Sequence, residues 1–302
     1  MSYRKEHQFS LSNAGYTDGL GLDLDKITEK ELRELWLETV QSGMHGLCFS
    51  IYEDGQSPGD IISKEQVKRR MQIIKPYTQW VRSFSCIEGN EHVPVVAKEL
   101  GMKTLVGAWL GSDMELNAKE VEGLIKLAKE GYVDIAAVGN EVMYRGDLTE
   151  EQLLEYIHKV KDALPDVTVG YVDAYYEFSH RPNITNACDV ILSNCYPYWE
   201  GCPIEYSLNH MQQMYGQASA AGQGKKVIIT ETGWPSQGEG LKGAHPSAAN
   251  AMKYFIDTQV WSQKNNIEVF YFSSFDEAWK IGDEGDVGAY WGLWDKDGKL
   301  KF

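Results

Sequence analysis

Lys226-Val-Ile-Ile-Thr-Glu231-Thr-Gly-Trp234-Pro235-Ser236 is a run of β-branched residues that stops at a carboxylate and then turns on glycine and proline. A second run, Asp134-Ile-Ala-Ala-Val-Gly-Asn140-Glu141-Val142, has the same form. Short continuous apolar runs are typical of strands that are buried on both faces. Because burying an unpaired carboxylate is costly, the two glutamates predict a paired-carboxylate site, the arrangement that cleavage of a glycosidic bond uses.

Runs of this strand-like kind alternate with helical patterns along the whole chain. Eight strands are expected, at Gly46–Tyr52, Trp80–Phe84, Thr104–Trp109, Ile135–Val138, Thr168–Val172, Val190–Asn194, Val227–Thr230 and Val269–Ser273. The first helix is expected to open at a capping box, Thr28-x-x-Glu31, and to run through Val40. Further helices are expected from Ser63 to about Lys75 and over His92–Leu100, Leu116–Glu130, Thr149–Ala163, Tyr206–Ala221 and Ser247–Asn265. The stretch after Asp173 gives no clear pattern.

This alternation predicts an α/β fold: a single (β/α)8 TIM barrel with a short N-terminal arm and helix. Residues 1–43 would form the arm and the helix that packs on the barrel, and residues 44–302 the catalytic domain. A doubly wound open sheet is the alternative. It would usually carry a glycine-rich phosphate loop after the first strand, where this chain has Glu53-Asp-Gly-Gln-Ser-Pro.

Charge and cysteine content narrow the possible partners and compartments. The formal net charge of −15 argues against nucleic acid and anionic membrane surfaces as partners, because both require clusters of Lys and Arg. The five cysteines show no disulfide framework, and the seven histidines show no metal-binding spacing. We therefore expect no metal and no cofactor. The start of the chain lacks a signal-peptide core, which predicts a cytoplasmic protein as the chain stands, or a periplasmic or secreted one if a signal was removed.

The two glutamates are expected to face each other across the mouth of the barrel. Glu141 would end the fourth strand and Glu231 the seventh, and reacting groups in such barrels come from the carboxyl ends of strands. Proximity raises the pKa of one carboxyl group, which then serves as the acid, while the other stays ionised. Asn140, directly before Glu141, could bind a sugar 2-hydroxyl.

Several ordered stretches make the chain resemble glycoside hydrolase family 17, the retaining β-1,3-glucanases and β-1,3-glucanosyltransferases. The likeness covers nearly all of the barrel, and the motif around Glu231 is the most specific part. It is carried by Tyr52-Glu-Asp-Gly-Gln-Ser-Pro58, Trp80-Val-Arg-Ser-Phe84, Val138-Gly-Asn-Glu-Val142, Asn194-Cys-Tyr-Pro-Tyr198, Thr230-Glu-Thr-Gly-Trp-Pro-Ser236, Phe275-Asp-Glu-Ala-Trp-Lys280 and Trp291-Gly-Leu-Trp-Asp295.

The resemblance implies that Glu141 is the general acid/base and Glu231 the nucleophile of a double displacement. Retention predicts carboxyl groups about 5–5.5 Å apart, against about 6.5–9.5 Å for an inverting pair. Glu277 and Lys280 match residues beside the family's catalytic pair, and the ammonium of Lys280 would hold Glu231 ionised. Tyr196 matches an aromatic residue whose hydroxyl could bond the nucleophile.

The resemblance also supplies candidate substrate contacts. Trp234, Trp279 and Trp291 could be platforms for sugar rings, although each could equally be a core residue. Tyr52 and Arg82 are expected to end the first and second strands and to shape the subsite. The chain has Phe49 where many family members carry tyrosine, which leaves the details of that subsite open.

The predicted function is that of a monomeric endo-β-1,3-glucanase that hydrolyses laminarin-type β-1,3-glucans or laminari-oligosaccharides with retention. A β-1,3-glucanosyltransferase, in which an acceptor sugar outcompetes water, is the close alternative, and the sequence does not separate the two. An alternative of another class is a non-catalytic β-glucan-binding protein on the same scaffold, against which the two intact glutamates argue.

Overall fold

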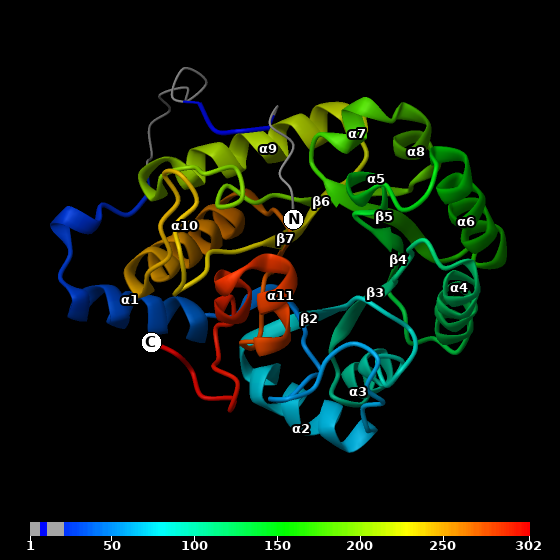
Figure 1. The fold of residues 1–302 in the computed structure, drawn as a ribbon, viewed down its shortest axis with the longest axis horizontal. Coiled ribbons are helices and arrows are strands. Elements are labelled where there is room, and N and C mark those ends of the chain that lie inside the picture. The colour runs from blue at the N-terminus through cyan, green and yellow to red at the C-terminus, as the bar shows by residue number, and fades with distance from the viewer. Residues whose placement is uncertain (1–6, 11–20) are drawn as a thin grey trace.

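Eight parallel strands close into a barrel in the computed structural model, which describes residues 7–10 and 21–302 of the chain (Figure 1). Each strand pairs with its neighbours in sequence, and β8 closes the barrel against β1. The (β/α)8 prediction is therefore confirmed. The strands are β1 Met44–Cys48, β2 Thr78–Ser83, β3 Lys103–Ala108, β4 Ile135–Asn140, β5 Thr168–Ala174, β6 Val190–Asn194, β7 Val227–Thr232 and β8 Val269–Tyr271.

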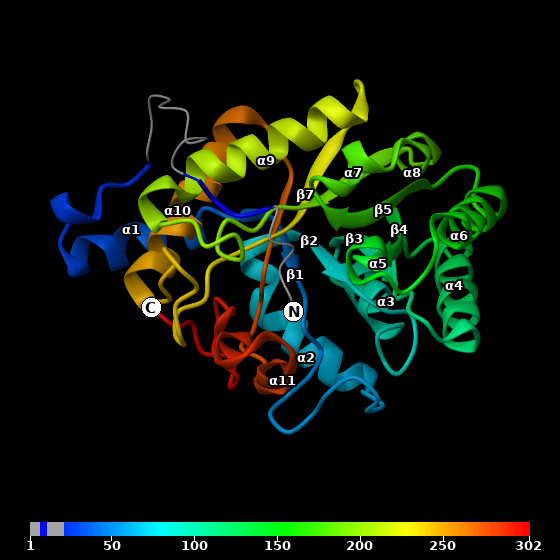
Figure 2. The same ribbon diagram turned by 45° about the horizontal axis from the view of Figure 1, so that its top comes forward.

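Helices surround the barrel, as Figures 1 and 2 show from two directions. They are α1 Glu29–Gln41, α2 Lys64–Ile74, α3 His92–Glu99, α4 Met114–Lys129, α5 Val142–Arg145, α6 Glu150–Ala163, α7 Glu177–His180, α8 Pro182–Ala187, α9 Ser207–Gly222, α10 Ala248–Asn265 and α11 Ile281–Glu284. The capping box predicted at Thr28 and Glu31 is present at the start of α1. No helix of the described part of the chain combines the length and apolar character that a membrane crossing requires.

The structure differs from the sequence prediction mainly at the ends of elements. β1 ends at Cys48, so Tyr52 lies in the following loop and does not end the strand. β8 also stops two residues early, at Tyr271, whereas β4, β5 and β7 each run two residues further than expected. The unclear stretch after Asp173 forms the short helices α7 and α8, which are separated by Arg181; Pro182 is the first residue of α8.

The N-terminal helix α1 lies on the outside of the barrel beside α10. Trp36 of α1 is fully buried, with its ring 6.1 Å from that of Phe255 in α10 and 5.1 Å from that of Phe302. The stretch after β8 forms only short helices, η5 (Ala278–Lys280), α11 and η6 (Asp286–Tyr290). Helix α1 thus covers barrel surface that a long helix after β8 would otherwise cover.

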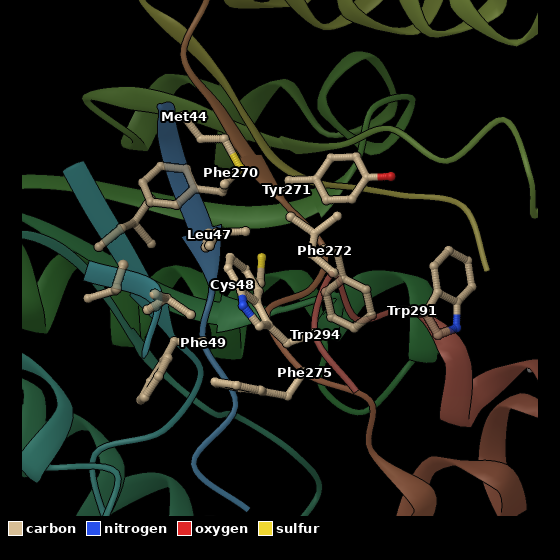
Figure 3. Close-up of a cluster of buried hydrophobic side chains, with 14 of the residues drawn as sticks. Met44, Leu47, Cys48, Phe49, Phe270, Tyr271, Phe272, Phe275, Trp291 and Trp294 are labelled. Atoms are coloured by element: carbon tan, nitrogen blue, oxygen red, sulfur yellow. The ribbon is translucent and has the colours of Figure 1, made fainter. Parts of the chain in front are cut away.

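The interior of the barrel is a close-packed hydrophobic core. Figure 3 shows part of it, where side chains from β1 and β8 meet residues that follow β8. Phe49 is 3% exposed and packs edge-on against Phe275, so the residue that departs from the family pattern lies in this core. Because the core fills the barrel, the site must lie above it, at the carboxyl ends of the strands.

Candidate active site

A pocket at the carboxyl ends of the strands contains both glutamates. Glu141, directly after β4, and Glu231, in β7, line it together with Asn194 of β6 and Phe272 after β8. The structure thus brings together two carboxylates that are 90 residues apart in the sequence. The pocket lies where catalytic residues of such barrels are found.

The backbone around Glu141 is shaped to point this side chain into the pocket. Gly139 has a φ of 88°, and Glu141 itself adopts a left-handed conformation with a φ of 51°. The pairing of β4 with β5 shifts register between Ala137 and Asn140. Irregular pairing and positive φ at a non-glycine residue are both costly features that cluster at functional sites, where they redirect a side chain.

Asn194 links the two halves of the site and was not predicted as a site residue. Its Nδ2 donates to Oε1 of Glu141 at 2.9 Å, while its Oδ1 accepts from the hydroxyl of Thr230 at 2.9 Å. The hydrogen bond from Thr230 fixes which end of the amide faces Glu141. Asn194 could have been predicted as a site residue from the sequence, because it ends β6 just as the two glutamates stand at or near the ends of their own strands.

Glu231 is held by two donors that come from other strands or loops. Arg82 of β2 donates from Nη1 to Oε1 of Glu231 at 2.6 Å, and the Tyr196 hydroxyl donates to Oε2 at 2.9 Å. The side chains of Arg82 and Glu231 are only 2% and 8% exposed. Both carboxylate oxygens are therefore occupied, which fixes the carboxylate plane.

The electrostatic surroundings of the two glutamates differ. Burial, and then the negative charge of Glu231, raise the pKa of Glu141 to about 7. The hydrogen bond from Asn194 opposes this shift, as do the more distant charges of Arg145 and Arg82. Near neutral pH the site therefore holds one carboxyl group that can carry a proton and one carboxylate that is paired with a guanidinium.

Asn140 is held by the same guanidinium that binds Glu231. Its Oδ1 accepts from Nη2 of Arg82 at 2.7 Å. The hydrogen bond from Arg82 takes up only Oδ1, so among the described residues Nδ2 is the end of the amide left to donate to a ligand beside the catalytic pair. Arg82 was expected only to shape the subsite, but it lies at the centre of the polar network.

The position of Lys280 corrects one expectation. Its ammonium pairs with Glu277, at 2.5 Å between Nζ and Oε2, and lies 4.1 Å from the centre of the Phe272 ring. Burial alone would lower the pKa of Lys280, but the negative charges of Glu277 and Glu284 raise it overall. The cation in direct contact with Glu231 is Arg82, so Lys280 acts on this carboxylate only from a distance.

Two of the three predicted sugar platforms are wrong. Trp234 and Trp291 are only 1% and 3% exposed, and both belong to the hydrophobic core, where Tyr198 packs edge-on against each of them. Neither has a free face for a sugar. Trp279 is half-buried and its indole nitrogen donates to Oε1 of Glu277 at 3.1 Å, while Tyr52 meets its ring edge-on.

Glu277 therefore organises a second polar group beside the pocket. Its Oε1 accepts from the Ser50 hydroxyl at 2.6 Å as well as from Trp279, and its Oε2 pairs with Lys280. Tyr52 lies at the edge of this group, where its ring meets that of Trp279. These residues come from the loops after β1 and β8, on the side of the barrel mouth away from Glu141.

Several other lining residues were missed by the sequence analysis. Glu284 of α11 lies in the pocket wall, and burial raises the pKa of its carboxyl group to about 7 against the lowering effect of Lys280. On the other side, loops after β4, β5 and β6 supply an aromatic wall. Its members are Tyr144, Tyr175, Tyr176 and Trp199, with Glu200 beside them, and they join the predicted Tyr196. These residues lie in loops or in helices of 4 residues, which are too short to carry a periodic signal, so the sequence did not reveal them.

In the described residues, no group of three or more His, Cys, Asp or Glu side chains is arranged to hold a metal ion. The chemistry available in the pocket is that of carboxyl groups, a buried guanidinium and hydrogen-bond donors. A proton donor and a fixed carboxylate in one pocket, with aromatic residues around them, suit acid-assisted displacement at a sugar carbon.

Comparison with known proteins links this geometry to one family. Residues 46–292 match the model of the BtgE/BtgC glycoside hydrolase domain. A glucan 1,3-β-glucosidase of Arthroderma benhamiae is 31% identical over 251 residues, which are 76% of this chain and 80% of the relative. A glucan 1,3-β-glucosidase of Saccharomyces cerevisiae is 26% identical over 269 residues, 81% of this chain and 86% of the relative.

Among solved structures, the family 17 β-1,3-glucanosyltransferase of Rhizomucor miehei is similar over 86% of this chain and 96% of its own. The TM-score is 0.77 and the sequence identity is 29%. An active-site mutant of that enzyme in complex with laminaritriose gives the same TM-score, identity and coverage.

Proposed function

The chain belongs to the BtgE/BtgC glycoside hydrolase domain family, within glycoside hydrolase family 17, and from this premise we propose that it cleaves internal β-1,3-glucosidic bonds with retention. The proposed substrates are laminarin-type glucans and laminari-oligosaccharides, the chemistry named for the similar enzymes. The observation that carries the proposal is the electrostatic difference between Glu141 and Glu231 in one pocket.

In the proposed first step, Glu231 attacks the anomeric carbon and Glu141 gives its proton to the departing oxygen. Arg82 pairs with the attacking carboxylate and Tyr196 donates a hydrogen bond to it, so that the two side chains orient it. The bond between the anomeric carbon and the leaving oxygen breaks as the glycosyl–Glu231 ester forms. The pKa of about 7 for Glu141 supports its role as acid, because about half of the carboxyl groups are protonated at pH 7, whereas an ordinary glutamate is almost fully ionised there.

In the second step, the ionised Glu141 takes a proton from a water molecule, which attacks the anomeric carbon and releases Glu231. Two inversions at one carbon give net retention. Asn140 is proposed to bind the sugar 2-hydroxyl through its free Nδ2, because Arg82 holds its Oδ1. Trp279, Tyr52 and the Glu277–Lys280 pair would contact the sugar that stays on the enzyme.

Transfer to a sugar acceptor is a second candidate function, and one observation favours it. The pocket wall formed after β4 and β6 contains aromatic side chains, including Tyr144 and Trp199. Such a wall can hold an acceptor sugar in place of water. The similar Rhizomucor miehei enzyme is a glucanosyltransferase. We further propose that the enzyme is a monomer.

The test is the incubation of the protein with laminari-oligosaccharides, followed by chromatography of the products and proton NMR of the first anomer released. The proposal expects a β-anomer first, and products longer than the substrate would add the transferase activity. Glu231→Gln should abolish turnover while binding remains, and Glu122→Gln, an exposed glutamate on α4, is the matched control. An α-anomer first, or full activity of Glu231→Gln, would overturn the mechanism.

A further inference from the structure

A short N-terminal segment, residues 7–10, lies against the rim of the active-site pocket. In both ribbon views it runs beside α9 (Figures 1 and 2). The backbone nitrogen of Phe9 donates to the carbonyl of Glu200 at 3.0 Å, and Glu200 is a pocket residue. The Phe9 ring stacks on Tyr206 with centroids 5.8 Å apart and meets His210 edge-on at 5.2 Å.

The anchored segment places one ring directly on the aromatic wall. The His7 imidazole is parallel to the Tyr176 ring, with an interplanar angle of 1° and a centroid distance of 3.5 Å. It also meets Tyr175 edge-on, at 6.4 Å. Tyr176 is only 5% exposed, although it lines the pocket that contains Glu141.

The position of Tyr176 in the pocket indicates which sugar is affected. The acid, Glu141, gives its proton to the leaving oxygen, so the leaving-group sugars lie on the side of Glu141. Tyr144 and Tyr176 follow β4 and β5 on this side. A flat ring on the face of a tyrosine occupies the space that the C–H face of a sugar ring would need for stacking.

We propose that His7 occupies a leaving-group subsite on the face of Tyr176 and thereby limits the length of leaving groups and acceptors that the enzyme accepts. The proposal rests on the proposed function, because it takes Glu141 as the proton donor. Phe9 is a positioning residue in it, which holds the segment through its contacts with Tyr206 and His210. The face of Tyr176 becomes a sugar platform only when the imidazole leaves.

The test compares kcat/KM for laminaritriose with kcat/KM for laminariheptaose in the wild type and in variants. His7→Ala should raise the ratio of the long to the short substrate about 3- to 10-fold, the worth of about one aromatic stacking contact. Phe9→Ala should act in the same direction. Gln8→Ala, an exposed neighbour in the same segment, should leave the ratio unchanged.

A double variant separates the proposed role from a structural one. In His7→Ala/Tyr176→Leu the gain for the long substrate should disappear, because the uncovered platform is gone. An unchanged ratio in His7→Ala, or an equal loss for every length together with a lower Tm, would overturn the proposal.

Oligosaccharide binding gives a second measurement, which does not depend on catalytic activity. Calorimetry of laminariheptaose and laminaritriose binding to Glu231→Gln, with and without His7→Ala, should show the same preference for length. If the wild type cleaves no β-1,3-glucan, the proposed function fails. In that case the proposal for His7 is judged by binding alone. It fails as well if His7→Ala does not change the preference for the longer oligosaccharide in binding.

Discussion

Replacement of Arg82 by methionine tests the polar network under the active site. The shortest polar contacts of the guanidinium are 2.6 Å to Glu231 and 2.7 Å to Asn140, and its central carbon lies 4.1 Å from the centre of the Phe84 ring. Arg82→Met keeps much of the buried aliphatic volume but removes the charge. It leaves the carboxylate of Glu231, 8% exposed, with the Tyr196 hydroxyl as its remaining side-chain donor.

The expected cost follows from this loss of one partner in a buried ion pair. Breaking such a pair destabilises a protein by about 3–5 kcal/mol, because an uncompensated charge stays buried. With an unfolding entropy of about 2.1 cal/mol/K per residue, a chain of 302 residues should then lose roughly 5–8 °C in Tm. The control Arg69→Met breaks an exposed ion pair with Glu53 and should cost about 0–1 kcal/mol.

The assay is urea denaturation followed by tryptophan fluorescence and circular dichroism, for the single variants and for Arg82→Met/Glu231→Gln. Glu231→Gln already removes the negative charge that Arg82 compensates. In this background Arg82→Met should therefore lower the free energy of unfolding by about 1–3 kcal/mol less than it does in the wild type. Equal costs of Arg82→Met in the two backgrounds would refute the idea that Arg82 compensates Glu231. A cost no larger than that of Arg69→Met would refute it as well.

The remaining predictions concern catalysis and pH. Tyr196→Phe removes the donor to Oε2 of Glu231 and should lower kcat about 10- to 100-fold with little change in KM, measured on laminaripentaose; an unchanged kcat would contradict the role. Because the pKa of Glu141 is raised to about 7, kcat/KM should fall tenfold per pH unit above about pH 7. Asn194→Leu removes a hydrogen bond that lowers this pKa, so the alkaline limb should move to higher pH; a shift to lower pH would count against it. The raised pKa also means that, between about pH 4.5 and 7, Glu141 is protonated in the folded state and ionised in the unfolded state. The free energy of unfolding of the wild type should therefore fall over this range, while that of Glu141→Gln should not, so the difference between the two should grow from pH 4.5 to about 7 and then level off. Thermal unfolding at a series of pH values measures this, and a constant difference would contradict it.

The strands were predictable because each carries a short apolar run, and burial on both faces demands such a run. Their ends were less predictable. The register shifts near Asn140 and Glu231 and the left-handed backbone at Glu141 depend on packing between strands, which a one-dimensional pattern does not contain. Both glutamates could nevertheless be named, because a carboxylate at the end of a buried run is unusual.

The contacts between distant residues could not be predicted from the sequence. Arg82 and Glu231 are 149 positions apart, and only the closed barrel brings β2 and β7 side chains together. For the same reason Lys280 was predicted as the cation beside Glu231, whereas the structure places Arg82 there and pairs Lys280 with Glu277. Tryptophan was equally ambiguous, because Trp234 and Trp291 have the residue type of sugar platforms but the burial of core residues.

The central claim, a covalent intermediate on Glu231, has one direct measurement. An activated 2-deoxy-2-fluoro β-glucoside extended by a β-1,3-linked glucose should trap the glycosyl-enzyme, because the fluorine slows its release. Mass spectrometry of the digested protein should then find the added sugar on the peptide that contains Glu231. A label on another carboxylate would contradict the account, and so would an unlabelled enzyme that still turns the reagent over.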